Sequence, residues 1–190
     1  MSDTNSFLDD LFDDFNKVQE LILPSEPSTA QSLSMHLTKI LILTCASYYE
    51  QQLQNAYISY AQHQADAYGD KPHGFYIDKK DKSVYQKFKF GKIENPEDQN
   101  QLPGTRQLLE PLISFGEKFK EKVFAEISSD PEKEKQLKAF QEIFAIRNLI
   151  AHQTFLEFSS AKVRGKSFND IKLLHNDAIK FVEYLIDKFQ

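Results

Sequence analysis

A long stretch without helix-breaking residues is the strongest constraint on the fold. Between Pro27 and Gly69 the chain contains no glycine or proline, and apolar side chains recur there at helical spacing. We predict one helix that starts at Pro27 and ends near Ala67, with Ser28 and Gln31 as a capping box. So long a helix, in a chain with only 6 Gly and 7 Pro, favours an all-α fold over an all-β one.

Four further segments show helical spacing of apolar side chains, so we expect a bundle of about five helices in a single domain of residues 1–190. Caps and prolines mark their limits. The four predicted segments are 6–22 ending before Pro24, 105–127 with Pro111 as a kink or restart, Asp130–Pro131 to about 158, and a last helix capped by Ser167 and Asp170.

Residues 69–104 break the helical pattern, because they hold four of the six glycines and three of the seven prolines. We predict an insertion with one short helix near 79–88. Lysines alternate there with aromatic side chains, as in proteins that bind single-stranded RNA. An alternative is a solvated loop whose aromatic rings pack on the bundle. The candidate RNA-binding residues are Lys79, Lys80, Lys82, Lys87 and Lys89.

The net charge of -5 excludes a uniformly basic surface, but the charge is uneven. Residues 1–30 hold seven acidic side chains and one lysine, so the acidic helix within 1–24 carries most of the negative charge.

The single cysteine, Cys45, permits no internal disulfide and indicates a reducing compartment. The chain starts without a signal-peptide pattern, and its longest apolar run, 40–46, is too short to span a bilayer. We expect a cytoplasmic protein without membrane contact.

The residues with the most chemical information are Arg147, Asn148 and His152, in the pattern Arg-Asn-x-x-x-His. RNA cleavage without a metal needs a group that moves protons near neutral pH, which suits His152, and a fixed positive charge on the phosphate, which suits Arg147. Asn148 can hydrogen-bond the imidazole or the phosphate. Because Arg147 and His152 point about 140° apart on a straight helix, one helix does not aim both at one atom. Two helices related by a two-fold axis permit this.

This motif, in a helical chain of this size, resembles the signature of the HEPN superfamily, and residues 30–188 resemble its RiboL-PSP type. The resemblance implies a HEPN-type bundle and a metal-independent endoribonuclease without a cofactor. It implies an obligate homodimer with a composite active site that leaves a 2′,3′-cyclic phosphate. By resemblance, His152 is the general acid or base, Arg147 orients the phosphate, Asn148 supports the site, and Glu50 pairs with Arg147.

The resemblance also implies a role as a toxin or antiviral-defence effector. RNA is then the substrate, and an antitoxin or regulatory protein is a further partner.

Two alternatives remain open at this point. Arg147 is in phase with Phe140, Phe144 and Ala151, so it can be a buried arginine that only holds the bundle together with Glu50. The chain would then be a non-catalytic helical module that binds RNA or a partner protein. In the second alternative, a partner releases a latent activity, and the acidic N-terminal helix masks the basic loop.

No metal site is expected. His36, His63, His73 and His175 lack the spacing of metal ligands, so surface or capping roles are expected for them. Cys45 is expected to be a small buried apolar residue.

Overall fold

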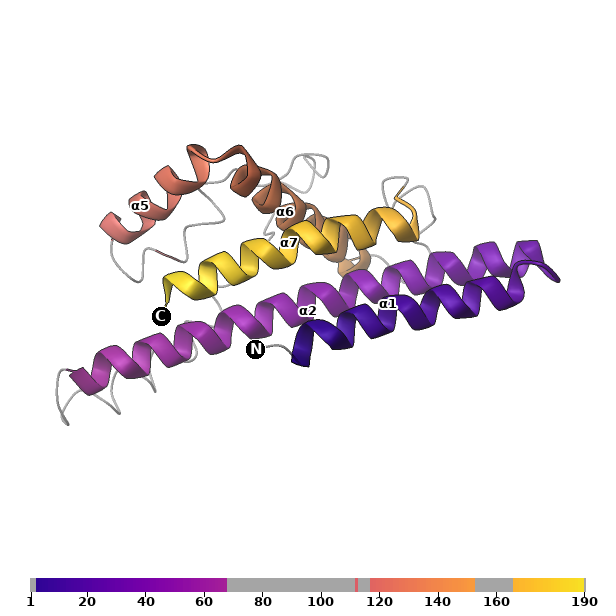
Figure 1. The fold of residues 1–190 in the computed structure, drawn as a ribbon, viewed down its shortest axis with the longest axis horizontal. Helices are drawn as coiled ribbons and strands as arrows, with labels where there is room; N and C mark the ends of the chain where they lie inside the picture. The colour runs from indigo at the N-terminus through magenta and orange to yellow at the C-terminus, as the bar shows by residue number, and fades with distance from the viewer. Residues whose placement is uncertain (1–2, 68–111, 113–116, 153–165, 190) are drawn as a thin grey trace.

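The computed structural model describes residues 3–67, 112, 117–152 and 166–189 (Figure 1). These residues confirm the all-α prediction. The predicted short helix 79–88 and the lysines of the 69–104 insertion lie outside the described residues, as do 105–111 and the segment after His152. The helices are α1 (Asp3–Ile22), α2 (Pro27–Ala67), α5 (Glu117–Ser128), α6 (Pro131–His152) and α7 (Phe168–Lys188).

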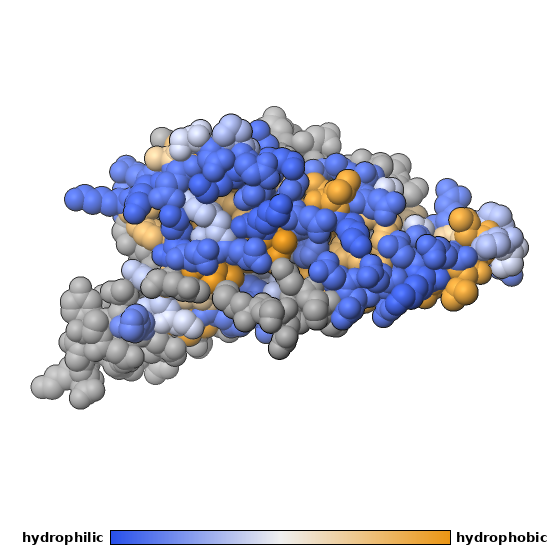
Figure 2. All heavy atoms as spheres, in the orientation of Figure 1, coloured by the Kyte–Doolittle hydropathy of each residue, from blue (hydrophilic) through white to orange (hydrophobic). Residues whose placement is uncertain are grey.

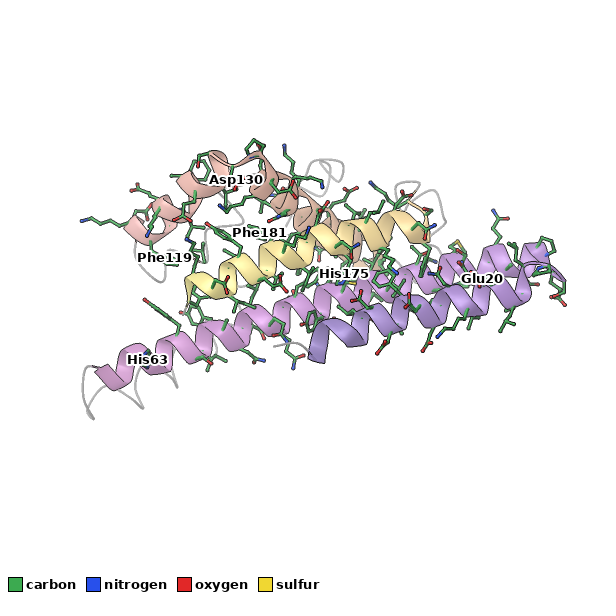
Figure 3. All side chains as sticks on the ribbon, viewed as in Figure 1. Glu20, His63, Phe119, Asp130, His175 and Phe181 are labelled. Carbon is green, nitrogen blue, oxygen red and sulfur yellow. The ribbon has the colours of Figure 1, made fainter. Side chains whose placement is uncertain are left out.

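The long helix α2 is the element along which the others are arranged. α1 folds back beside α2 as the second arm of a hairpin, and α7 runs along α2 next to α1 (Figure 1). α6 packs against both α7 and α2, and α5 joins α6 at a bend near Asp130 (Figures 1 and 3). The site motif at the end of α6 is therefore brought next to the middle of α2.

Two of the predicted helix starts are present, and one is shifted. Ser167 and Asp170 form a capping box at α7, and the Asp130 carboxylate accepts hydrogen bonds from the backbone N–H groups of Glu132 and Lys133 at α6. At α2, the Ala30 N–H donates to the carbonyl oxygen of Glu26. Glu26 is therefore the cap and Ser28 lies inside the first turn, because Pro27 already has the backbone angle of a first helical residue.

A single cluster of buried side chains contains residues from all five helices. α1 contributes Leu8 and Phe12, both fully buried, and its acidic residues Asp10, Asp13 and Asp14 point outward. The acidic helix is thus part of the core. Deleting residues 1–24 would open the core, so a masking role has to be tested by changing charges and not by truncation.

A buried polar contact lies where α1, α2 and α7 meet. His175 is 2% exposed, its Nδ1 lies 2.6 Å from the Tyr49 hydroxyl, and its ring packs 5.4 Å from that of Phe12. The expected surface or capping role of His175 is therefore wrong, since the residue lies on the apolar face of α7 (Figure 3). Cys45 is buried beside it, 3.8 Å from Nδ1, which confirms the expected burial, and burial raises the thiol pKa to about 12.

The face of the molecule that Figure 2 shows is mostly polar. Large apolar side chains are exposed at the tip where α1 turns into α2, at Leu21 and Leu23, and singly at Leu173 on α7. Among the helices described here, none is long and apolar enough to cross a membrane.

The buried histidine predicts how stability depends on pH. Burial lowers the pKa of His175 to about 4, so between about pH 6.5 and pH 4 the unfolded chain binds a proton that the folded chain does not. The free energy of unfolding therefore falls as the pH drops, by roughly 2 kcal/mol for this residue between pH 7 and pH 5. Urea unfolding at the two pH values measures the difference.

The substitution His175→Gln should remove that part of the pH dependence. His63→Gln, at an exposed position on α2, is the matched control and should behave as the wild type. An equal pH dependence in His175→Gln and the wild type would contradict the assignment.

Candidate active site

Arg147 lies near the end of α6, where the helix faces α2. The preceding positions in phase with it, Phe140 and Phe144, are fully buried, whereas Ala151 is exposed. The Arg147 side chain is 31% exposed, so it marks the point where the apolar face of α6 reaches the surface. The Arg147 side chain therefore extends from the edge of the core, and part of it is accessible to solvent.

Two acceptors hold the Arg147 guanidinium. Its Nη2 lies 3.4 Å from a carboxylate oxygen of Glu50 on α2, and its Nη1 donates to the amide oxygen of Asn148 at 3.1 Å. The pairing of Arg147 with Glu50 expected from the family resemblance is thus present across the two helices. Asn148 contacts the arginine, a partner not considered in the sequence analysis, which expected the imidazole or the phosphate.

Burying the carboxylate of Glu50 in its charged form costs free energy. Its side chain is 22% exposed, and burial raises the pKa of Glu50 by more than the charge of Arg147 lowers it. A pair whose desolvation outweighs its attraction contributes little to folding. Residues kept in such an environment are candidates for function, because stability alone does not explain them.

His152 is the last residue of α6. Its backbone follows Arg147 by more than one helical turn, and its side chain lies outside the described part of the structure. The candidate RNA-binding residues Lys79, Lys80, Lys82, Lys87 and Lys89 also lie outside it. The described part of the site is therefore the Glu50, Arg147 and Asn148 cluster, and the role of His152 remains a prediction.

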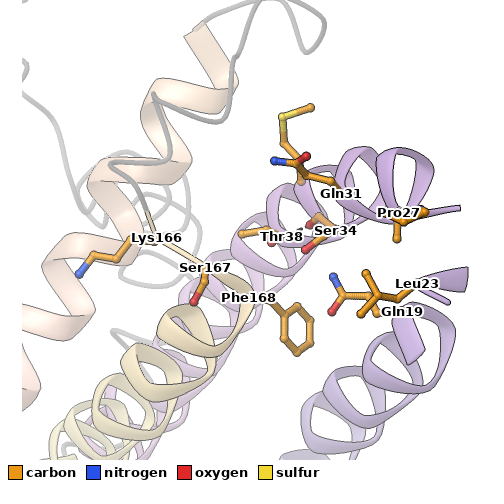
Figure 4. Close-up of a pocket in the computed structure, with 11 residues that line it drawn as sticks. Gln19, Leu23, Pro27, Gln31, Ser34, Thr38, Lys166, Ser167 and Phe168 are labelled. Carbon is orange, nitrogen blue, oxygen red and sulfur yellow. Dashed lines mark hydrogen bonds between the residues drawn. The ribbon is translucent and has the colours of Figure 1, made fainter. Parts of the chain in front are cut away.

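A separate cleft of about 390 Å³ opens between α1, α2 and the start of α7 (Figure 4). Gln19, Ser34 and Phe168 are among its lining residues. The nearest of its α2 residues to Glu50 is Thr38, about 18 Å away along the helix. The cleft is thus distinct from the Arg147 cluster and contains none of the predicted site residues.

The described residues contain no group of three or more His, Cys, Asp or Glu side chains that could hold a metal ion.

The buried Cys45, Tyr49 and His175 were not recognised as a group in the sequence. A usable signal was present, because His175 lies at helical spacing from Ile171, Ala178 and Val182, all buried residues of α7.

The sequence matches the RiboL-PSP-HEPN family over residues 8–190. The protein is therefore an all-α protein of the HEPN class, and it belongs to the RiboL-PSP-HEPN family. No curated protein and no solved structure matches the chain significantly. Membership of this family is compatible with a nuclease or another RNA-related role.

The Glu50–Arg147 pair predicts a small coupling energy. In a double-mutant cycle with Glu50→Gln and Arg147→Gln, we expect a coupling of about 1 kcal/mol or less in the free energy of unfolding, because both groups are partly solvated and Glu50 is desolvated by more than it gains. Urea unfolding of the four proteins measures it. A coupling of several kcal/mol would instead favour the interpretation in which the pair only holds the bundle together.

Proposed function

We propose that the protein is a metal-independent endoribonuclease of HEPN type. The observation that carries the proposal is the guanidinium of Arg147, which is half-buried, fixed by Glu50 and Asn148, and located five residues before the predicted proton-transfer residue His152. Membership of the RiboL-PSP-HEPN family supports it. A role as a toxin or antiviral-defence effector in the cytoplasm belongs to the same proposal and rests on the family resemblance.

In the proposed reaction the 2′-hydroxyl oxygen of a ribose attacks the adjacent phosphorus. The bond from phosphorus to the 5′-oxygen of the next nucleotide breaks, which leaves a 2′,3′-cyclic phosphate and a free 5′-hydroxyl. A base takes the proton of the 2′-hydroxyl, and an acid gives a proton to the leaving oxygen. An imidazole suits either task near neutral pH, so His152 is assigned to proton transfer.

Arg147 is assigned to the phosphate. Negative charge grows on the phosphate oxygens as the new bond forms, and a fixed guanidinium stabilises that charge without reorganising. Glu50 and Asn148 accept hydrogen bonds from two different nitrogens of the guanidinium, which fixes its plane. Both are therefore positioning residues in this scheme, and the remaining donors of Arg147 are available for the phosphate oxygens.

A homodimer completes the site in this proposal. Arg147 and His152 diverge by about 140° on one straight helix, so two copies related by a two-fold axis supply groups to one shared centre.

The second candidate function is a non-catalytic helical module that binds RNA or a partner protein. It is favoured only if the Arg147 cluster stabilises the bundle, and the raised pKa of Glu50 argues against that. A latent enzyme released by an antitoxin or regulatory protein is compatible with the first proposal.

Cleavage of labelled RNA in EDTA tests the proposed enzyme. We expect wild-type protein to cut RNA in the chelator, and His152→Ala and Arg147→Ala to lose on the order of 10²-fold or more in rate, as is typical when an acid–base group or a charge-stabilising donor is removed. His63→Ala, on the exposed face of α2, is the matched control. Equal cleavage by all four folded proteins, or none by the wild type, would contradict the proposal.

The lysines of the 69–104 insertion are proposed to contact RNA phosphates. Replacing Lys79, Lys80 and Lys82 with Gln should weaken binding of a single-stranded RNA and make its salt dependence shallower, by about 0.7 per lost phosphate contact in the slope of log K against log salt. Fluorescence anisotropy at several salt concentrations measures the slope. An unchanged slope would remove these lysines from the RNA-binding surface.

A further inference from the structure

The cleft between α1, α2 and the start of α7 has a lining with a chemistry of its own. Its volume of about 390 Å³ lies in the range of small-molecule sites, which is roughly 300–1,000 Å³. Three helices contribute to it, and Figure 4 shows Gln19 of α1 and Phe168 of α7 projecting into the gap beside Thr38 of α2. The cleft is therefore large enough for a small organic ligand.

The neutral polar groups of the cleft offer both hydrogen-bond donors and acceptors. Gln19 is half-buried and Gln31 is exposed at the edge, and each amide donates through its nitrogen and accepts through its oxygen. Thr38 is 4% exposed, and its hydroxyl donates to the carbonyl oxygen of Ser34 at 2.7 Å. Its oxygen therefore still has a lone pair with which to accept. These groups suit a ligand whose edge carries donors beside acceptors.

Apolar side chains form the walls around these polar groups. Met35 is half-buried on α2, and a thioether packs favourably against an aromatic ring. Phe168 is 5% exposed and is held edge-on at 5.5 Å from Phe12, so it forms a rigid inner wall. Among the described residues that line the cleft, none is acidic and Lys166 is the charged one. The lining thus suits a flat, neutral heterocycle with a polar edge.

We propose that the cleft binds an adenine base. Adenine presents the N6 amino donor beside the N7 acceptor, and a glutamine amide matches that pair with two hydrogen bonds. Guanine presents two neighbouring acceptors at the same edge, which favour arginine or lysine. Packing of the ring and hydrogen bonding of the edge are also how unpaired bases of RNA are recognised. A free adenine nucleotide and an unpaired adenosine of an RNA strand both supply this base.

Lys166 connects the cleft with the helix that carries the candidate active site. Its side chain is 30% exposed, and its Nζ lies 3.2 Å from a carboxylate oxygen of Glu142 on α6, toward which it extends in Figure 4. Nζ has three donors, so others remain for a phosphate attached to the bound nucleoside. Glu142 precedes Arg147 by five residues, or about 7.5 Å along α6. The phosphate side of the cleft therefore faces α6.

This position has a consequence for RNA that rests on the proposed function. The cleft and the Arg147 cluster are separated by about 18 Å along α2, between Thr38 and Glu50, and a stacked strand advances about 3.4 Å per nucleotide. One strand of about five nucleotides then spans the distance from an adenine in the cleft to a phosphate at Arg147. We therefore expect cleavage at a fixed offset of up to about five nucleotides from an unpaired adenosine.

Calorimetric titration of the full-length protein with AMP tests the cleft. We expect AMP to bind, cytidine monophosphate to bind at least about tenfold more weakly, and Gln19→Leu and Gln31→Leu each to raise the Kd for AMP about tenfold, because each removes a hydrogen bond to the base. Gln51→Leu, at an exposed glutamine of α2 outside the cleft, is the matched control and should bind AMP as the wild type does.

Gln31 is exposed, so its substitution should leave the fold intact, and circular dichroism checks this. Absence of AMP binding at millimolar concentration, equal affinity for the two nucleotides, or an unchanged Kd in folded Gln31→Leu would overturn the proposal.

Competition distinguishes the two sources of the base. An oligomer of 2′-O-methyladenosine lacks the attacking hydroxyl, so the proposed reaction does not cut it. Displacement of AMP by this oligomer, and not by the matching cytidine oligomer, would support an adenosine of RNA as the ligand. AMP binding that neither oligomer displaces would support a free nucleotide in the same cleft.

Failure of this inference and failure of the proposed function are distinguishable. In an RNA of cytidines with a single adenosine, cuts should cluster at one offset, and Gln31→Leu should remove the clustering while total cleavage persists. Cleavage by a protein that does not bind AMP would overturn the adenine site and support the enzyme. AMP binding that depends on Gln31, in a protein that does not cut RNA, would support the adenine site and contradict the enzyme.

Discussion

The contact between Tyr49 of α2 and His175 of α7 is the interaction on which the arrangement of the bundle depends. It joins the middle of the longest helix to the last helix of the chain, and Phe12 of α1 packs against the same imidazole. A buried hydroxyl and a buried imidazole each need a partner, so the rotation of α2 and α7 relative to one another is restricted to the one that satisfies both. The aromatic rings of Phe140 and Phe144 on α6 also pack against Tyr49.

That restriction extends to the candidate site through the next residue. Glu50 follows Tyr49, so the rotation that buries the tyrosine also points the carboxylate toward α6 and Arg147. The pair gains little stability from its own contact, because Glu50 loses more to burial than it gains from the arginine. The cluster is thus held in place by apolar packing around Tyr49 and not by the attraction between its two charges.

The sequence predicted the helices well because their signals are local. The prolines and caps near residues 24, 131 and 167 and the spacing of apolar side chains are readable without the fold. It also predicted the Glu50–Arg147 pair, through the family resemblance. The contact of Asn148 with Arg147 was not predictable, because adjacent residues on a helix do not usually face each other, and a long arginine has to curl back to reach its neighbour. The burial of His175 could be inferred from its place in the apolar stripe of α7, but its partner, Tyr49, could not, because the two residues are 126 positions apart in the sequence.

The position of Phe12 has a consequence for synthesis of the chain. This side chain leaves the ribosome early, but its ring contacts, Phe168 and His175, are on the last helix to be made. Until α7 is released, α1 and α2 therefore expose an apolar seam, and a chain that ends before α7 keeps Glu50 and Arg147 without the packing that orients them. Chaperones and proteases should recognise such an incomplete product by its exposed apolar side chains. Only chains that contain α7 should therefore escape degradation.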